Sequence, residues 1–327
     1  MTVLITGGAG YIGSHAILAF RAAGYGVIVL DNLSTGCRDT VPADVPFIQC
    51  NADDMERVQA IIKTYGIASV VHFAGSLVVP ESVEKPLNYY HNNTATSRSL
   101  LEVCVKCGVP HFIFSSTCAI YGIVDELPIT EKTPTQPINP YGRSKLMTEQ
   151  ILHDTAAAHK LSFVSLRYFN VAGADPKGRV GQSTPQATQL IKVACEAMVG
   201  KREAVTIFGE DYDTPDGTCI RDYIHVSDLV AAHVRALQYL EAGGESQVLN
   251  CGYGHGFSVK EILEKIQEVA GRKLDIRKGP RRPGDPPELV ADPSQIQKIL
   301  GWQPIHNDLL EIIDSALRWE RKLVHLT

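Results

Sequence analysis

Short apolar runs alternate with longer amphipathic segments through the first half of this 327-residue chain. The apolar runs predict buried strands, at residues 3–5, 27–30, 47–50, 69–73, 111–114 and 163–167. The amphipathic segments predict helices at residues 16–20, 55–65, 86–107 and 140–159. Because strands that alternate with helices form βαβ units, we predict an α/β fold with a doubly wound parallel sheet and helices on both faces.

The second half of the chain is less regular and richer in Gly and Pro. Its pattern predicts helices at residues 186–199, 227–240, 259–270, 293–300 and 309–323, the third beginning with a capping box of Ser258 and Glu261. We therefore expect two domains. Residues 1–170 form the first, with a return contribution from about 220–250, and residues 171–327 form a smaller mixed α/β domain.

Composition narrows the possible partners and setting. The net charge of −5, without a basic run, argues against a nucleic-acid surface. No apolar stretch is long enough for a membrane helix, and Met1 leads directly into the first strand, which leaves no room for a signal peptide. We therefore expect a cytoplasmic protein. Cys104 and Cys107 form a C-x-x-C pair without a second pair or clustered histidines, so no metal is predicted.

Glycines follow the first strand at positions 7, 8, 10 and 13. In a strand–turn–helix unit, such glycines allow a tight turn and bring the backbone close to a pyrophosphate, which the helix N-terminus then binds. Asp31 ends the second strand, 18 residues after Gly13, where an acid binds ribose hydroxyls and repels a 2′-phosphate. These features predict a Rossmann-type dinucleotide site that takes NAD rather than NADP.

A second candidate site begins at Asn139, a favourable N-cap, followed by Pro140 at the first helical position. Tyr141 and Lys145 are then one helical turn apart on one face. A phenol has a pKa of about 10, but an ammonium group and the positive helix end both favour phenolate, as a general base requires. The spacing alone occurs by chance. Its position after the glycines and after Thr117, a hydroxyl at a strand end, favours catalysis.

At this point the chain resembles the extended short-chain dehydrogenase/reductase family and, within it, the UDP-glucose 4-epimerases. The resemblance covers nearly the whole length. It is carried by TGGAGYIGSH (6–15), DNLSTG (31–36), FAGSLVVPESVEKPLNYYHNN (73–93), FSSTCAIYG (114–122), NPYGRSK (139–145), RYFNVAGADP (167–176), TIFGEDYDTPDGTCIRDYIHVSDL (206–229) and RRPGDPPELVAD (281–292). The last three stretches belong to the half of these proteins that binds the nucleotide sugar.

The resemblance implies that Tyr141 takes the proton of the sugar 4-hydroxyl while the hydrogen at C4 passes to tightly bound NAD. Thr117 would bond the same oxygen, and Lys145 would bind the nicotinamide ribose. The 4-keto sugar would then turn about its diphosphate and regain the hydrogen on its other face. A homodimer is implied, with its contact on the helices from Pro86 and from Pro140.

The implied contacts fall into two sets. Those with NAD are Gly7, Gly10, Tyr11, Ile12, Gly13, Asp31, Asn32, Asn51, Ala52, Phe73, Ala74, Gly75, Asn92, Ser115, Tyr141, Lys145 and Tyr168. Those with the UDP-sugar are Thr117, Tyr141, Asn170, Gln189, Leu190, Thr206, Phe208, Arg221, Arg282 and Asp285. The two arginines suit a diphosphate, because a guanidinium group offers fork-shaped donors and a fixed charge.

Several alternatives stay open at this stage. A nucleotide-sugar 4,6-dehydratase needs an acid and a base after Thr117, where this chain has Cys118 and Ala119. Epimerases of UDP-N-acetylglucosamine, UDP-xylose or UDP-arabinose, and UDP-glucuronate share the same motifs. Leu289 is intermediate in bulk at a position that governs N-acetylated sugars, so the identity of the sugar is undecided. A non-catalytic NAD-binding protein would lack Tyr141 or Lys145, and both are present.

Overall fold

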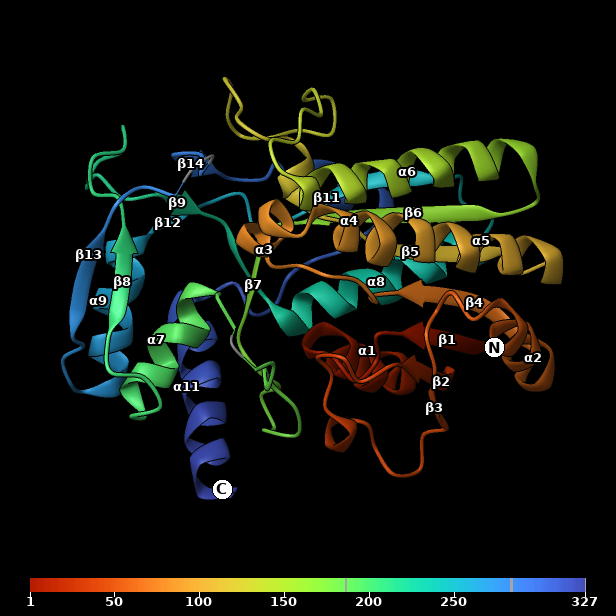
Figure 1. Ribbon diagram of the computed structural model, residues 1–327, viewed down its shortest axis with the longest axis horizontal. Helices are drawn as coiled ribbons and strands as arrows, with labels where there is room; N and C mark the ends of the chain where they lie inside the picture. Colours follow the sequence, from red (N-terminus) through yellow and green to blue (C-terminus); the bar gives the residue numbers. More distant parts are fainter. Residues whose placement is uncertain (186, 283–284, 327) are drawn as a thin grey trace.

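A seven-stranded parallel sheet forms the centre of the larger part of the protein (Figure 1). The computed structural model describes residues 1–185, 187–282 and 285–326. The strand order is β11-β6-β5-β4-β1-β2-β3. The strands span Thr2–Thr6 (β1), Gly26–Asp31 (β2), Phe47–Gln49 (β3), Ile67–His72 (β4), His111–Ser115 (β5), Ser162–Tyr168 (β6) and Gln247–Cys251 (β11). This order confirms the doubly wound parallel sheet; the sequence pattern identified six of the seven strands and missed β11.

Helices cover both faces of the sheet and enclose separate apolar cores. Helices α1 (Tyr11–Ala22) and α8 (Val226–Glu241) pack together on one face, over Val3 and Ile5. The other face, with Leu4, is covered by α2 (Met55–Tyr65), α5 (Thr96–Cys107) and α6 (Pro140–Ala158). The alternation of side chains along β1 therefore supplies both cores, as expected for a strand buried on both faces.

Two helix predictions need correction. Helix α1 begins at Tyr11 rather than at residue 16, because Gly13 forms part of its first turn. The segment 86–107 is helical throughout, as predicted, but α4 (Pro86–Tyr89) is followed by a π-helical segment, Tyr90–Ala95, before α5. A short helix that the pattern did not predict, α3 (Val79–Glu84), precedes them.

The smaller part contains short strands and three helices that Figure 1 labels at the left, α7 (Leu190–Met198), α9 (Val259–Ala270) and α11 (Leu309–Leu326). The capping box of Ser258 and Glu261 is confirmed. The predicted helix 186–199 begins later, at Leu190, and residue 186 lies outside the described residues. Helix α10 (Ser294–Leu300) packs instead against α8 and β11 of the larger part. The strands are β7 (Asn170–Ala172), β8 (Val205–Phe208), β9 (Ile220–Arg221), β10 (Tyr223–His225), β12 (Phe257–Ser258), β13 (Ile276–Gly279) and β14 (Glu288–Leu289).

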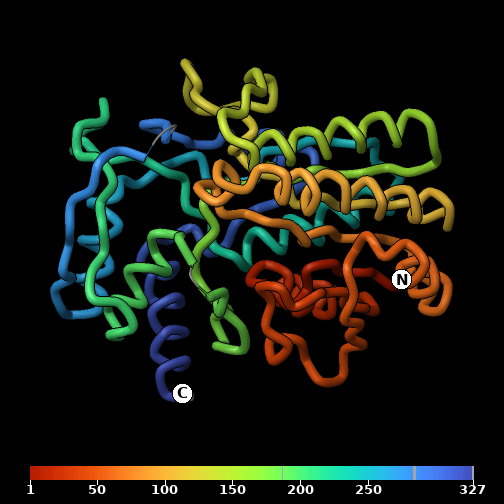
Figure 2. Tube along the Cα trace, in the orientation of Figure 1, coloured from red at the N-terminus to blue at the C-terminus, as the bar shows by residue number. Residues whose placement is uncertain are grey.

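The chain passes between the two parts more than once, as the colours of Figure 2 show. After the short pairing of β7 with β10, α8 returns to the face of the sheet, and β11 joins its edge beside β6. Residues that follow β6 and residues that precede α8 therefore lie side by side, at the carboxyl end of the sheet. In doubly wound sheets this end carries the ligand site.

Within the described residues, no helix combines the length and the apolar character needed to cross a membrane. The same part of the chain contains no group of three or more His, Cys, Asp or Glu side chains that could hold a metal ion. Cys104 is buried in α5, and burial raises the pKa of its thiol well above the ordinary value, which disfavours the thiolate.

Candidate active site

The glycine loop, residues 7–13, joins β1 to α1 in a conformation that side chains would prevent. Gly7 has a φ of +71°, and a Cβ atom there would lie 2.6 Å from the backbone nitrogen of Ala74. A Cβ on Gly13 would collide with the carbonyl oxygen of Gly7. Gly10 occupies the N-cap of α1, and no side chain caps this helix. The first-turn N–H groups are thus left for an anion, which is the arrangement that a pyrophosphate requires.

Asp31 lies beside this loop at the end of β2. Its Oδ2 accepts a hydrogen bond from the backbone nitrogen of Ala9 (2.9 Å), and its Oδ1 accepts from that of Leu33 (2.8 Å). On the neighbouring strand end, Asn51 accepts from the Asn32 side chain at 3.0 Å, and Ala52 beside it is buried. A carboxylate fixed in place next to an uncapped glycine loop fits the ribose and the pyrophosphate of a dinucleotide. The residues present therefore fit NAD.

The segment after β4 forms the next wall of this region. Phe73 packs against His233 of α8, with ring centroids 4.8 Å apart. Asn92 donates to Ser76 Oγ at 3.0 Å and is exposed. Its buried neighbour Asn93, which sequence reasoning missed, bonds the backbone of Ser76 and donates to a serine of α6. Two asparagines in a row gave no sign of which one faces the interior, because a π-helical segment shifts the helical register there.

Helix α6 begins as the sequence predicts. The Asn139 side chain accepts from the backbone nitrogen of Gly142 at 2.9 Å, and Pro140 is the first helical residue. Tyr141 and Lys145 are both buried. The Lys145 ammonium group donates to the carbonyl oxygen of Ser115 (2.9 Å) and lies 4.9 Å from the centroid of a phenylalanine ring in β5. The helix cap and the end of β5 together fix where these two side chains point.

The pKa of Tyr141 departs from the sequence prediction. Burial raises the pKa of Tyr141 above its ordinary value, and the neighbouring Tyr168 adds a smaller effect in the same direction. The side chain of Thr117 acts in the opposite direction and lowers this pKa. Burial also lowers the pKa of Lys145 to about 8, against the charge of Glu149, which raises it. In the ligand-free protein, desolvation of the phenol dominates, so the net shift of the Tyr141 pKa is opposite to the one that the sequence predicts.

Sequence reasoning also missed a buried ion pair behind the catalytic candidates. Glu149, one turn beyond Lys145 on α6, pairs with Arg167 of β6 at 2.6 Å. The same carboxylate accepts hydrogen bonds from the hydroxyls of Ser116 (2.6 Å) and Ser165 (2.9 Å). These bonds join α6 to the carboxyl ends of β5 and β6. The i, i+4 spacing from Lys145 was the available signal, but only the strand order shows that Arg167 lies opposite.

The predicted sugar residues lie in the smaller part in three groups. Asn170, Gln189 and Leu190 line one pocket between β7 and α7. Arg221 pairs with Asp285 at 2.5 Å, and its guanidinium group also donates to the carbonyl oxygens of residues 220, 286 and 287. The third group, Thr206, Phe208 and Arg282, is at β8, where the guanidinium carbon of Arg282 lies 4.1 Å from the centre of the Phe208 ring.

The catalytic candidates adjoin this half of the site. Thr117 is buried and caps a short 3₁₀ turn, Cys118–Ile120. That turn packs in one apolar cluster with Leu289 of β14, and β14 is paired with β9 so that Leu289 lies opposite Arg221. On the cofactor side, the hydroxyls of Ser115 and Tyr168 are 2.7 Å apart. The fold therefore brings the dinucleotide wall, the Tyr141 turn and Arg221 to one end of the sheet.

Comparison with known proteins agrees with this geometry. The family model described as NAD dependent epimerase/dehydratase family matches residues 3–252. A UDP-glucose 4-epimerase of Azospirillum brasilense is 56% identical over 98% of this chain and 92% of its own length.

Solved structures resemble the protein over nearly its whole length. The UDP-glucose 4-epimerase of Stenotrophomonas maltophila, with bound NAD and formylated UDP-arabinopyranose, has a TM-score of 0.96 at 36% identity and covers 100% of both chains. The UDP-Glc/GlcNAc 4-epimerase of Campylobacter jejuni has a TM-score of 0.86 at 47% identity, over 98% of this chain and 99% of its own.

Proposed function

Since the chain belongs to the NAD dependent epimerase/dehydratase family, we propose that it interconverts UDP-glucose and UDP-galactose by inverting the configuration at C4. The observation that carries this proposal is the buried turn of α6. It directs Tyr141 towards Thr117, between the dinucleotide site and the ion pair of Arg221 with Asp285. This arrangement suits the reversible oxidation of a sugar hydroxyl.

NAD is the cofactor, and when bound it supplies the acceptor and the donor of the hydrogen at C4. The glycine loop and the uncapped N-terminus of α1 would hold the pyrophosphate, and Asp31 would hold the adenosine ribose. The Lys145 ammonium group would bind the nicotinamide ribose from its position at the end of β5. A fixed carboxylate at Asp31 would repel a 2′-phosphate, which supports NAD over NADP.

Tyr141 removes the proton from the 4-hydroxyl in one half of the reaction and returns it in the other. The Thr117 hydroxyl would bond the same sugar oxygen, and it lies close enough to the phenol to lower its pKa, so it would align the proton transfer. The positive charge of Lys145 would favour phenolate, against the effect of burial, which raises the pKa of the phenol. Glu149 and Arg167 hold the strand ends on which Thr117 and Ser115 lie.

The UDP part stays bound while the 4-keto sugar rotates about its diphosphate. Arg221 and Arg282 would hold the diphosphate, and Asn170 and Leu190 would line the adjoining pocket. The Arg221 guanidinium group is already bound to Asp285, so the loop that carries this acid is held at the site before the substrate arrives. The dehydratase alternative lacks support, because Cys118 and Ala119 provide neither acid nor base after Thr117.

The sugar can be identified with UDP-galactose, UDP-N-acetylgalactosamine and UDP-arabinose supplied in parallel, without added NAD. We expect UDP-glucose from UDP-galactose as the fastest reaction. No NAD is added, because NAD stays bound and is regenerated in each turnover. Product identification by nuclear magnetic resonance distinguishes the epimers. If UDP-galactose remains unchanged while UDP-N-acetylgalactosamine or UDP-arabinose is converted, the assignment of the hexose is wrong. An absolute need for added NAD in stoichiometric amounts would instead indicate a net dehydrogenase.

We also propose a homodimer. Two apolar side chains on helices that pack against α6 are highly exposed, Leu87 on α4 (79%) and Val83 on α3 (64%), and Met147 on α6 is 41% exposed. Exposed apolar side chains that gather on adjacent helices are typical of an interface. The expected contact is on α4, α5 and α6.

Sedimentation should give twice the chain mass of 35.7 kDa, and Leu87→Glu should shift the protein towards that single-chain mass. Leu310→Glu is a matched control, because Leu310 is also exposed but lies on α11. A wild-type protein that sediments as a single chain would refute the dimer.

A cytoplasmic setting and a role in galactose metabolism complete the proposal. All eight cysteines lie within the described residues and are free thiols, which is typical of a reducing compartment. We also propose that residues 1–170, with about 220–250, form the NAD-binding domain, and that residues 171–327 bind the nucleotide sugar. The pairing of β11 with β6 supports the return segment.

A further inference from the structure

One peptide group, between Gly173 and Ala174, joins the glycine loop to the C-terminal helix. The carbonyl oxygen of Gly173 accepts a hydrogen bond from the hydroxyl of Tyr11 at 2.7 Å. The N–H group of Ala174 donates to Ser315 Oγ at 3.1 Å. The C=O and N–H of one trans peptide point in opposite directions. The peptide is therefore held from one side by the first residue of α1 and from the other side by α11.

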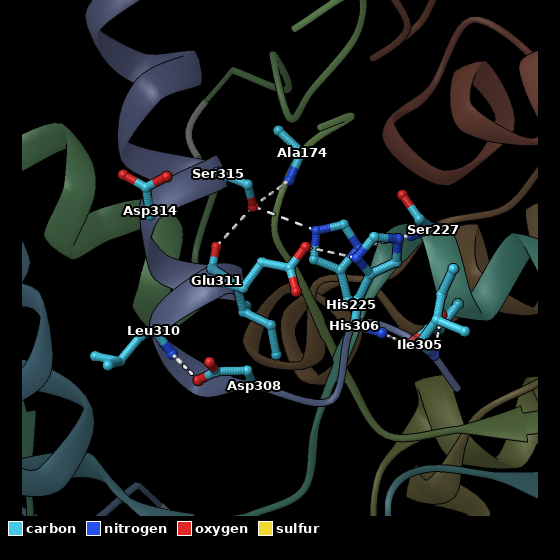
Figure 3. A network of polar contacts seen from close by, with 12 residues as sticks. Ala174, His225, Ser227, Ile305, His306, Asp308, Leu310, Glu311, Asp314 and Ser315 are labelled. Atoms are coloured by element: carbon cyan, nitrogen blue, oxygen red, sulfur yellow. Dashed lines mark hydrogen bonds and ion pairs between the residues drawn. The ribbon is translucent and has the colours of Figure 1, made fainter. Parts of the chain in front are cut away.

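The donor and the acceptor of each hydrogen bond at Ser315 can be assigned in only one way, and Figure 3 shows these bonds. Ser315 Oγ donates to the carbonyl oxygen of Ile312 at 2.9 Å, so it accepts from Ala174 and from Nε2 of His225, the latter at 3.3 Å. Nδ1 of His225 accepts from the backbone nitrogen of Ser227 at 3.0 Å. The Nε2 atom of His225 must then carry the hydrogen. Every donor in this chain of bonds thus has an acceptor.

Close packing keeps His225 against this peptide. Gly173 has a φ of +89°, and a Cβ atom there would lie 2.6 Å from Cδ2 of His225. His306 also packs against the imidazole, with ring centroids 4.7 Å apart, and its Nδ1 lies 2.6 Å from a carboxylate oxygen of Glu311 (Figure 3). A side chain at position 173 would separate His225 from the peptide.

The two titratable groups that hold the peptide, His225 and Tyr11, are both neutral at neutral pH. Burial lowers the pKa of His225 to about 3, so the ring is neutral and keeps the tautomer that Ser315 requires. Burial raises the pKa of Tyr11 well above its ordinary value, so its hydroxyl remains a donor. Tyr11 is further fixed by the edge of the His15 ring, 5.3 Å between centroids.

We propose that Ser315 and His225 are positioning residues that act through the 173–174 peptide on Tyr11 and thereby slow the release of NAD. This inference rests on the proposed function only in taking NAD as the bound dinucleotide. Tyr11 begins the turn of α1 whose N–H groups would face the pyrophosphate. When the peptide loses its bond to Ser315, Tyr11 loses a fixed acceptor, and the glycine loop opens more readily.

The test is the exchange of bound, isotopically labelled NAD for an excess of unlabelled NAD, measured on the purified holoenzyme without sugar. Ser315→Ala and Tyr11→Phe should each speed the exchange about fivefold, the factor that one hydrogen bond of typical strength is worth. Because both act through the same peptide, the double variant should exchange little faster than either single variant. Ser315→Thr, which keeps the hydroxyl, should restore slow exchange.

Asp314→Asn is the matched control, since Asp314 directly precedes Ser315 on α11 and pairs with Arg318 at the surface. It should exchange NAD like the wild type. Unchanged exchange in Ser315→Ala, or multiplied effects in the double variant, would overturn the proposal. Exchange is measured below the unfolding temperature of every variant, so a merely structural role of Ser315 would lower that temperature and leave exchange unchanged. Faster exchange in a protein that epimerises no UDP-sugar would uphold this inference and refute the proposed function.

Discussion

Replacement of Tyr141 by Phe should lower turnover of UDP-galactose by about 10²- to 10⁴-fold, the range that general acid–base catalysis contributes. The substitution removes only the hydroxyl. The side chain is buried, so Phe keeps the packing and loses the group that transfers the proton. The measurement is kcat without added NAD, together with the NAD content and the circular dichroism of the variant, both of which should match the wild type.

Tyr89→Phe provides the matched control. Tyr89 is buried edge-on to Tyr141, with ring centroids 6.4 Å apart, and its hydroxyl donates to the backbone of residue 78. The variant loses a buried tyrosine hydroxyl from the same region, yet it should keep turnover within a few-fold of the wild type. Near-normal rates in Tyr141→Phe, or equal losses in the two variants, would show that the base is misassigned.

Lys145→Met should also slow turnover by about 10²-fold or more and move the remaining activity to higher pH. The direction follows from the charges. A tyrosine acts as a base when deprotonated, and a nearby cation lowers the pKa of a phenol. Without that cation, the pKa of Tyr141, already raised by burial, rises further, and phenolate forms only at higher pH.

The wild-type profile supplies the comparison for Lys145→Met. The pKa of Lys145 is lowered to about 8 by burial, so its charge is present below that pH and is lost above it in the ligand-free protein. The measurement is the pH dependence of kcat for both proteins. A profile that keeps its position in the variant would refute the electrostatic role and leave Lys145 only the binding of the ribose.

The parts of the site that could be predicted from the sequence are local ones. The glycine loop, the strand before it and Asp31 lie within one βαβ unit, where spacing along the chain fixes spacing in the fold. The start of α6 was equally clear, because Asn139 is its N-cap and Pro140 its first residue, and both signals act within the helix itself. The side chains of Tyr141 and Lys145 then share one turn.

The rest depends on contacts between distant segments. Strand β11 begins at Gln247 and joins the sheet beside β6, which no local pattern indicates. Arg167 pairs with Glu149 only because β6 lies next to β5 under α6. The direction of the Tyr141 pKa shift depends on burial, and burial is a property of the folded chain. The bonds from the 173–174 peptide to Tyr11 and Ser315 likewise join residues that are remote in sequence.

The proposed mechanism requires that one bound cofactor accepts the hydrogen of the sugar C4 and then returns it to the same carbon. Its most direct test supplies UDP-galactose carrying deuterium at C4, in ordinary water and without added NAD, and examines the product by nuclear magnetic resonance and mass spectrometry. We expect UDP-glucose that retains the deuterium at C4, with no net formation of reduced cofactor. Loss of the deuterium to solvent, or conversion that stops after one equivalent of reduced cofactor has formed, would contradict it.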